Sequence, residues 1–128
     1  MQTVTPYLLY EDAAAALGWL AEAFGFRETD RMARPDGAVA HAEMAVGTDG
    51  KIFLGQPGGD YRNPKHLDTA TALVYAYVDG LDAHCEQARA AGAEIVDEPE
   101  DQPYGDRRYS CRDPEGHHWY FAEPVRAG

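Results

Sequence analysis

Asp113-Pro114-Glu115-Gly116-His117-His118-Trp119-Tyr120-Phe121 is the stretch that decides the fold of this chain. Its first four residues predict a tight turn, because Pro114 fixes φ for an early turn position and Gly116 can adopt a positive φ where the chain reverses. The ring-bearing side chains that follow predict a strand, because aromatic residues fit a pleated, half-buried surface. A weaker copy of the same turn and strand, Asp49-Gly50-Lys51-Ile52-Phe53-Leu54-Gly55, lies upstream. This repetition organises the whole sequence.

The composition predicts one soluble globular domain over residues 1–128, with 45% hydrophobic and 26% charged residues. No apolar run approaches the ~20 residues that would span a bilayer, and the N-terminus has no basic and apolar leader. Two cysteines, Cys85 and Cys111, are too few for a disulfide framework. We therefore expect both thiols to be reduced and the protein to be cytoplasmic, with Cys111 buried for structural reasons.

The formal net charge of −11 argues against nucleic acid and anionic membranes as partners, because both attract basic surfaces. The same charge would favour the approach of a cationic small molecule. The plainer alternative is that acidic residues keep the surface soluble.

Turn residues divide the first half into five predicted elements. Asp12 is a plausible N-cap for a helix, and Gly25 is placed to end it. The predicted elements are a strand at 3–10, a helix at 13–24, and strands at 26–33, 39–46 and 51–55.

The second half repeats this order after a connection rich in Gly, Pro and Asp at 56–70. It comprises a strand at 71–78, a helix at 81–91, and strands at 94–98, 107–112 and 117–123. Three pairs of landmarks share almost one offset: Asp12 with Asp79 (79 − 12 = 67), Gly25 with Gly92 (92 − 25 = 67) and Gly50 with Gly116 (116 − 50 = 66). We predict an α+β fold of two βαβββ modules, the first at 3–56 and the second at 70–124. One helix can cover only one face of each sheet, so the other face must be buried elsewhere or line a cavity.

The turn at residues 113–116, Asp12, the helix end Ala23-Phe24-Gly25-Phe26 and the segment Val78-Asp79-Gly80-Leu81-Asp82 resemble the vicinal oxygen chelate superfamily over residues 3–124. The similarity is greatest to its glyoxalase/bleomycin-resistance branch. This resemblance implies that the paired modules curl into a cupped mixed sheet, with the helices outside and a small-molecule ligand inside. It also implies a homodimer, because small members of the family commonly complete their cups at a dimer interface.

Enzymes of that family hold a divalent metal with one His or Glu near the same place in four strands. Local landmarks place these positions at Thr5, Leu54, Leu73 and Tyr120. Leucine has no donor atom, and Thr and Tyr are poor ligands for such metals. We therefore expect no metal cofactor, and the resemblance favours metal-free binding members.

Period-two alternation from Tyr120 predicts which side chains face the cup. The predicted ligand-binding residues on these strands are Tyr7, Leu54, Leu73, Tyr75, Tyr77, His118 and Tyr120. A mostly apolar lining with sparse polar groups is typical of a small-molecule pocket. The alternatives are that these side chains fill the cup themselves or pack against a second subunit.

His41 and Glu43 lie two residues apart on a predicted strand, so both point to one face. They are included among the ligand-binding residues, because such a pair can do acid–base work or begin a metal site with His118 as a third ligand. The alternative is a solvated strand face. His84, on the second predicted helix, is expected at the surface.

The first functional hypothesis is a metal-independent binding protein that sequesters a cationic or aromatic, antibiotic-like compound. The second is a metal-dependent lyase, isomerase or dioxygenase with a displaced metal site at His41, Glu43 and His118. The third is an interaction module with a filled cup.

Overall fold

The computed structural model describes residues 2–67 and 69–125. The first half forms a four-stranded sheet in the order β1-β4-β3-β2, with β1 parallel to β4 and the other neighbours antiparallel. Its elements are β1 (Tyr7–Leu9), α1 (Ala13–Phe24), β2 (Arg27–Ala33), β3 (Val39–Val46) and β4 (Gly50–Gly55). We call this sheet the first sheet.

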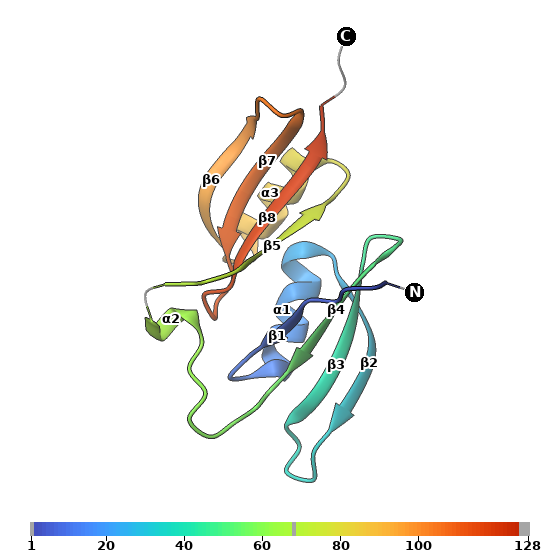
Figure 1. The fold of residues 1–128 in the computed structure, drawn as a ribbon, viewed down its shortest axis with the longest axis vertical. Coiled ribbons are helices and arrows are strands. Elements are labelled where there is room, and N and C mark those ends of the chain that lie inside the picture. The colour runs from blue at the N-terminus through green and yellow to red at the C-terminus, as the bar shows by residue number, and fades with distance from the viewer. Residues whose placement is uncertain (1, 68, 126–128) are drawn as a thin grey trace.

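The second half repeats the arrangement in a separate second sheet with the order β5-β8-β7-β6 (Figure 1). Its elements are β5 (Leu73–Tyr77), α3 (Leu81–Ala90), β6 (Glu94–Asp101), β7 (Asp106–Arg112) and β8 (His118–Pro124). The edge strand β5 is parallel to β8, as β1 is to β4. The predicted α+β fold with mixed sheets is therefore confirmed.

The two halves share one hydrophobic core, in which α1 contacts α3. Phe24, at the end of α1, packs against Trp119 and Phe121 of the second sheet, with ring centroids 5.2 and 4.7 Å apart. The core also contains Met44 and Leu54 of the first sheet, both fully buried. Each sheet thus buries its helix-facing side and leaves the opposite side, here called its open face, accessible.

The ends of α1 follow the sequence prediction. The Asp12 side chain accepts a hydrogen bond from the N–H of Ala15 at 3.1 Å, and Gly25 ends the helix at φ +76°. The match of Asp12 with Asp79 was wrong by one residue, because the N-cap of α3 is Gly80. The two helices begin at Ala13 and Leu81, an offset of 81 − 13 = 68.

The match of Gly50 with Gly116 was also wrong. Gly116 has φ +89° within its turn, whereas Gly50 is the first residue of β4 and the positive φ before that strand belongs to Gly47. The strand pairing gives the true equivalence. Tyr7 of β1 pairs with Phe53 of β4, and Tyr75 of β5 pairs with Tyr120 of β8. Phe53 is therefore the counterpart of Tyr120.

The connection between the halves contains a short helix that the sequence did not predict, α2 (Pro64–Leu67). Asn63, just before it, is fully buried although it is polar. Hydrogen bonds to both halves hold this segment, as described below.

Candidate functional site

The open face of the second sheet carries four tyrosines around one aspartate and one arginine. We call this group the tyrosine face; it consists of Tyr75, Tyr77, Tyr104, Asp106, Arg108 and Tyr120. The rings of Tyr75 and Tyr120 lie nearly parallel, 22° apart with centroids at 6.2 Å, and Tyr77 meets Tyr75 edge-on at 5.7 Å. Tyr75, Tyr77 and Tyr104 are 38%, 57% and 60% exposed. Exposed rings held in fixed positions are suited to stacking with a planar molecule.

Asp106 holds two of these tyrosines in place through their hydroxyl groups. It is buried, and its Oδ2 accepts hydrogen bonds from the hydroxyls of Tyr75 at 2.7 Å and Tyr77 at 2.9 Å. Desolvation, followed by the bond to Asp106, raises the pKa of the Tyr75 phenol. The pKa of Tyr77 is raised mainly by its own hydrogen bond to Asp106. Both phenols therefore stay neutral donors, and their rings are the groups left for contact.

Arg108 adds a cation to the same face. Its guanidinium carbon lies 4.9 Å from the centroid of the Tyr120 ring, and its Nη1 donates to the Tyr104 hydroxyl at 2.7 Å. The Nε of Arg108 is buried and has no hydrogen-bond partner among residues 2–67 and 69–125. A ligand oxygen can satisfy such a donor.

His118 lies beside Tyr120, with ring centroids 5.4 Å apart. Burial and then the nearby Arg112 lower the pKa of His118, so it stays neutral near pH 7. Its Nε2 is buried without a partner in the described part of the chain. His118 and Arg112 also line a polar hollow of about 640 Å³ at this end of the sheet.

The open face of the first sheet carries a smaller polar group. The Tyr7 hydroxyl lies 3.0 Å from Nδ1 of His41, and Nε2 of His41 lies 3.2 Å from Oε2 of Glu43. The ring of Phe53 packs against both Tyr7 and His41, with centroids at 5.8 and 5.0 Å. His41 and Glu43 therefore do share one strand face, and Tyr7 joins them from the edge strand.

The structure divides the predicted site residues between the two sheets. Tyr7, His41 and Glu43 belong to the first sheet; Leu73, Tyr75, Tyr77, His118 and Tyr120 belong to the second.

Leu54 is a correction, because it is fully buried in the core and the open-face residue of β4 is Phe53. The error came from the Gly50 landmark, since a shift of one residue along a strand exchanges its two faces.

The displaced metal site is not assembled within one chain. His41 and Glu43 lie on the first sheet and His118 on the second, and residues 2–67 and 69–125 contain no group of three His, Cys, Asp or Glu side chains that could hold an ion. The four family positions, read with the corrected β4 register as Thr5, Phe53, Leu73 and Tyr120, also fail to fit a metal, because they offer no strong donor set.

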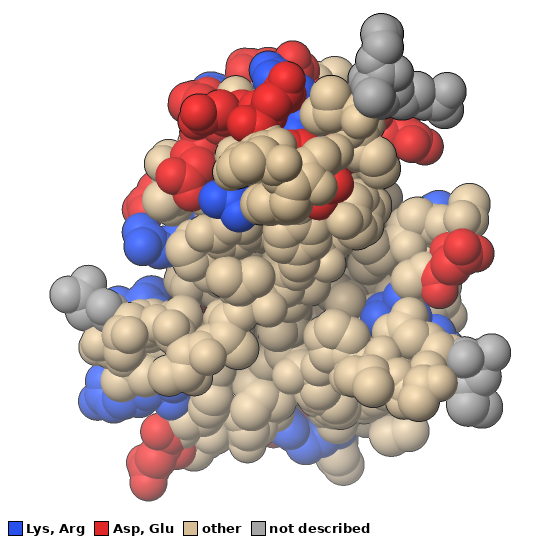
Figure 2. Space-filling view, turned by 45° about the horizontal axis from the view of Figure 1, so that its top comes forward, with Lys and Arg blue, Asp and Glu red and all other residues tan. Residues whose placement is uncertain are grey.

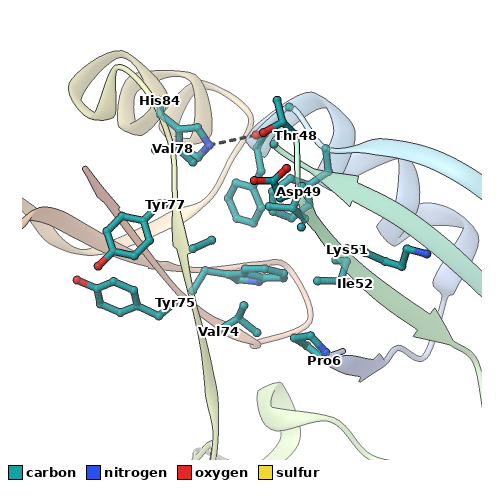
Figure 3. A pocket seen from close by; sticks show the side chains of 18 of the residues that line it. Pro6, Thr48, Asp49, Lys51, Ile52, Val74, Tyr75, Tyr77, Val78 and His84 are labelled. Carbon is teal, nitrogen blue, oxygen red and sulfur yellow. Dashed lines mark hydrogen bonds between the residues drawn. The ribbon is translucent and has the colours of Figure 1, made fainter. Parts of the chain in front are cut away.

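A groove of about 700 Å³ runs along the seam between the two halves (Figure 3). Its walls include core side chains such as Phe24, Ile52 and Trp119, together with Val74 of the edge strand β5 and Val78 just after that strand. The groove and the tyrosine face share Tyr75 and Tyr77. The groove at the seam therefore lies next to the tyrosine face, and it is distinct from the polar hollow at His118 and Arg112.

His84, at this seam, is a correction to the prediction that it lies at the surface. Its Nδ1 accepts from the Tyr109 hydroxyl at 2.6 Å, and its Nε2 lies 3.0 Å from the carbonyl oxygen of Phe24. Burial lowers the pKa of His84, and the bond to the Phe24 carbonyl partly opposes this effect.

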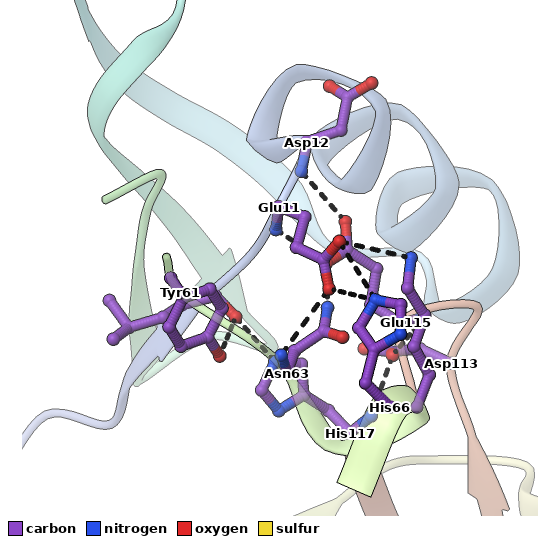
Figure 4. A network of polar contacts seen from close by, with 10 residues as sticks. Glu11, Asp12, Tyr61, Asn63, His66, Asp113, Glu115 and His117 are labelled. Carbon is purple, nitrogen blue, oxygen red and sulfur yellow. Dashed lines mark hydrogen bonds and ion pairs between the residues drawn. The ribbon is translucent and has the colours of Figure 1, made fainter. Parts of the chain in front are cut away.

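A polar network that the sequence did not predict joins both halves to the connection between them (Figure 4). Glu115 accepts from the backbone N–H of Glu11 at 2.6 Å and of Asp12 at 3.0 Å, and also from the side-chain amide of Asn63. Asp113 accepts from the Tyr10 hydroxyl at 2.6 Å. These contacts make the turn at residues 113–116 a junction between the modules.

Negative charge is concentrated at the end of the molecule that contains the second sheet (Figure 2). Part of it comes from the acidic side chains of β6, which are Glu94, Asp97, Glu98, Glu100 and Asp101. A cation in solution would therefore be attracted toward the half of the protein that carries the tyrosine face.

Residues 3–121 match the family model described as Glyoxalase/Bleomycin resistance protein/Dioxygenase superfamily. Uncharacterized proteins of Mycobacterium bovis and Mycobacterium tuberculosis are 34% identical to this chain over 96% of its length, covering 84% and 75% of those proteins.

Among solved structures, TioX from Micromonospora sp. ML1 is 31% identical, with a TM-score of 0.77, and the match covers 98% of this chain and 100% of TioX. A glyoxalase-related enzyme from Clostridium phytofermentans shares the fold at 16% identity, with a TM-score of 0.74 over 98% of this chain and 96% of the enzyme. Within the described residues, no helix has the length and apolarity needed to cross a membrane.

Proposed function

Because the chain belongs to the glyoxalase/bleomycin resistance protein/dioxygenase superfamily, we propose that it is a metal-independent binding protein. Its ligand is a planar aromatic compound, preferably a cation, held on the tyrosine face. The observation that carries this proposal is the set of exposed tyrosine rings whose positions are fixed by Asp106 and Arg108.

Ring stacking supplies most of the binding energy. An aromatic pair contributes ~0.5–1.5 kcal/mol beyond its buried area, and a cation over an aromatic face contributes ~0.5–2 kcal/mol. One such contact is too weak for micromolar binding, so the ligand must contact several of Tyr75, Tyr77 and Tyr120 at the same time. The negative charge of this half favours a ligand cation, while Nε of Arg108, which has no partner in the part of the chain that the structure describes, favours a ligand oxygen at one edge.

A second copy of the chain is the proposed cover for this face. The open faces leave Tyr7 of β1 49% exposed, and Leu73 and Tyr77 of β5 47% and 57% exposed. Exposed apolar patches of this kind mark interaction surfaces. In a homodimer an open face of one chain would close over an open face of its partner and enclose the ligand. Light scattering should then give the mass of two chains, whereas the mass of one chain at micromolar concentration would contradict the dimer.

The planar cation ethidium is a suitable probe of the tyrosine face, because its fluorescence rises when it leaves water. We expect Tyr120→Ala to weaken ethidium binding about tenfold, which corresponds to ~1.4 kcal/mol. The matched control is Met32→Ala, which removes a side chain that is 61% exposed on β2 of the other module. Unchanged affinity in folded Tyr120→Ala would refute the binding site.

A neutral probe separates the contribution of the ligand charge from that of stacking. Calorimetry would compare the affinity of neutral phenanthridine with that of ethidium.

Metal independence has its own test. Protein purified without chelator or affinity tag should contain no stoichiometric Ni, Zn, Mn or Fe, and EDTA should leave the ethidium affinity unchanged. One tightly held ion per chain would overturn this part of the proposal.

A further inference from the structure

Tyr7, His41 and Glu43 form a continuous hydrogen-bonded chain on the open face of the first sheet. The distances are 3.0 Å from the Tyr7 hydroxyl to Nδ1 of His41 and 3.2 Å from Nε2 of His41 to Oε2 of Glu43. The other carboxylate oxygen of Glu43 lies 3.6 Å from Nζ of Lys51. None of these four residues belongs to the tyrosine face.

The sheet order explains how these side chains meet. His41 and Glu43 point to one side of β3, but Tyr7 belongs to β1, and β4 lies between these two strands. The Tyr7 ring reaches across because it passes over Gly55. A Cβ atom at Gly55 would lie 2.9 Å from Cε1 and 3.0 Å from the hydroxyl oxygen of Tyr7. A glycine at this point therefore allows the phenol to reach the imidazole.

The order of the groups fixes the direction in which protons can move. An ionised Glu43 can only accept, so Nε2 of His41 carries the hydrogen and Nδ1 presents its lone pair. The Tyr7 hydroxyl then donates to Nδ1. A carboxylate that orients an imidazole, which in turn accepts a proton from a hydroxyl, is the arrangement by which enzymes activate an oxygen atom.

We propose that Tyr7, His41 and Glu43 are a proton relay that activates the Tyr7 oxygen toward a small molecule bound on the first sheet. In the step, an acidic X–H bond of the ligand breaks and its electron pair stays on X. The proton forms a new O–H bond with Tyr7, while the original Tyr7 proton passes to Nδ1 of His41. The resulting imidazolium lies beside the Glu43 carboxylate, which balances its charge. Phenols and C–H groups next to a carbonyl are the class of ligand whose acidity suits a tyrosine base.

The exposure of the three groups agrees with this role. Tyr7 is 49% exposed, so its oxygen can meet a ligand, while the side chains of His41 and Glu43 are only 27% and 25% exposed. Phe53 packs against the edges of the Tyr7 and His41 rings and keeps them in place. This activity goes beyond ligand binding on the tyrosine face, and it does not depend on that binding.

The reagent phenylmethanesulfonyl fluoride tests the relay without a known substrate. An activated phenol oxygen attacks its sulfur, the S–F bond breaks and fluoride leaves, while the phenol proton passes to the base. Peptide mass spectrometry would follow the labelling of Tyr7, with free N-acetyltyrosinamide in the same tube as an unactivated phenol. We expect Tyr7 to react at least ~10-fold faster than this reference, since a positioned base can contribute more than that.

The variants His41→Gln and Glu43→Gln should bring the Tyr7 rate down toward that of the reference. Gly55→Ala should do the same by displacing the ring, although the relay residues are intact. The control His66→Gln removes an exposed histidine elsewhere and should leave the rate unchanged. The proposal is overturned if Tyr7 reacts no faster than N-acetyltyrosinamide, or if folded His41→Gln labels at the rate of the natural protein.

Discussion

The Glu115 carboxylate accepts a hydrogen bond of 2.6 Å from the backbone N–H of Glu11, so the last turn of the second module supports the start of the first helix. Glu123 has the equivalent role within the second module, where it accepts from the N–H groups of Gly80 and Leu81. The two carboxylates differ in their surroundings, because Glu115 is buried and also bonded to Asn63.

Glu115→Ala should therefore be much more damaging than Glu123→Ala. We expect the first change to lower the free energy of unfolding by about 2–4 kcal/mol, because it leaves buried donors unpaired. The second removes only a helix cap that water can replace, which costs ~0.5–1 kcal/mol. Urea unfolding of both variants gives the comparison, and equal losses would contradict a structural role for the junction.

Gly116→Ala should be worse than Gly92→Ala. Both glycines have positive φ, at +89° and +97°, so each alanine suffers the same backbone penalty of ~1–2 kcal/mol. A Cβ at Gly116 would also lie 2.5 Å from the backbone N of Lys65, whereas a Cβ at Gly92 would have no atom of the described residues within 4 Å. The extra crowding should cost ~1–3 kcal/mol more. The midpoints of thermal unfolding would show it, and indistinguishable midpoints would mean that α2 does not pack against this turn.

His84 should make the protein less stable as the pH falls from 7 toward 5. Its folded pKa is lowered by burial, so the unfolded chain takes up a proton below about pH 6.5 that the folded protein refuses. Protonation of Nδ1 would also displace the hydrogen bond from Tyr109. His84→Gln should flatten the dependence of the unfolding free energy on pH in this window.

His118→Gln is the control for that measurement, because the pKa of His118 is lowered too, first by burial and then by Arg112. In His118→Gln, the unfolding free energy should still fall between pH 7 and 5 by the amount that His84 contributes. The pKa values of Glu11 and Glu98 are also lowered, but these groups change the unfolding free energy only below about pH 4.5, outside this window. A slope in His84→Gln as steep as in the natural protein would refute the assignment.

Both cysteines should resist thiol reagents in the folded protein. Burial raises the pKa of Cys85 to about 11 and that of Cys111 further, and both are fully buried. Since the thiolate is the reactive form, dithionitrobenzoate should react with neither residue at pH 8 until denaturant is added. Rapid reaction of one thiol without denaturant would show that the core opens there.

The alternation of polar and apolar residues along the strands was sufficient to predict the faces of most site residues. Tyr75, Tyr77 and Tyr120 lie on the open face, with Trp119 and Phe121 toward the helices, because successive side chains of a strand alternate. The same rule failed at Leu54, because the alternation was counted from Gly50 as if this glycine were the turn residue before the strand. Gly50 is instead the first residue of β4. Register depends on turn geometry, which sequence reasoning resolves least well.

The sequence by itself determined the repeated order of strands and helices, the helix ends at Asp12 and Gly25, and the absence of strong ligands at the family's metal positions. These depend on local preferences and on residue chemistry. Only the tertiary structure decided that Tyr7 reaches His41 across Gly55, that Glu115 binds the backbone N–H groups just before the first helix, and that half-buried His84 bonds to Tyr109 at the seam. Each of these contacts joins residues far apart in the chain. Their distances follow from how the two modules and their strands pack, which no local pattern of residues specifies.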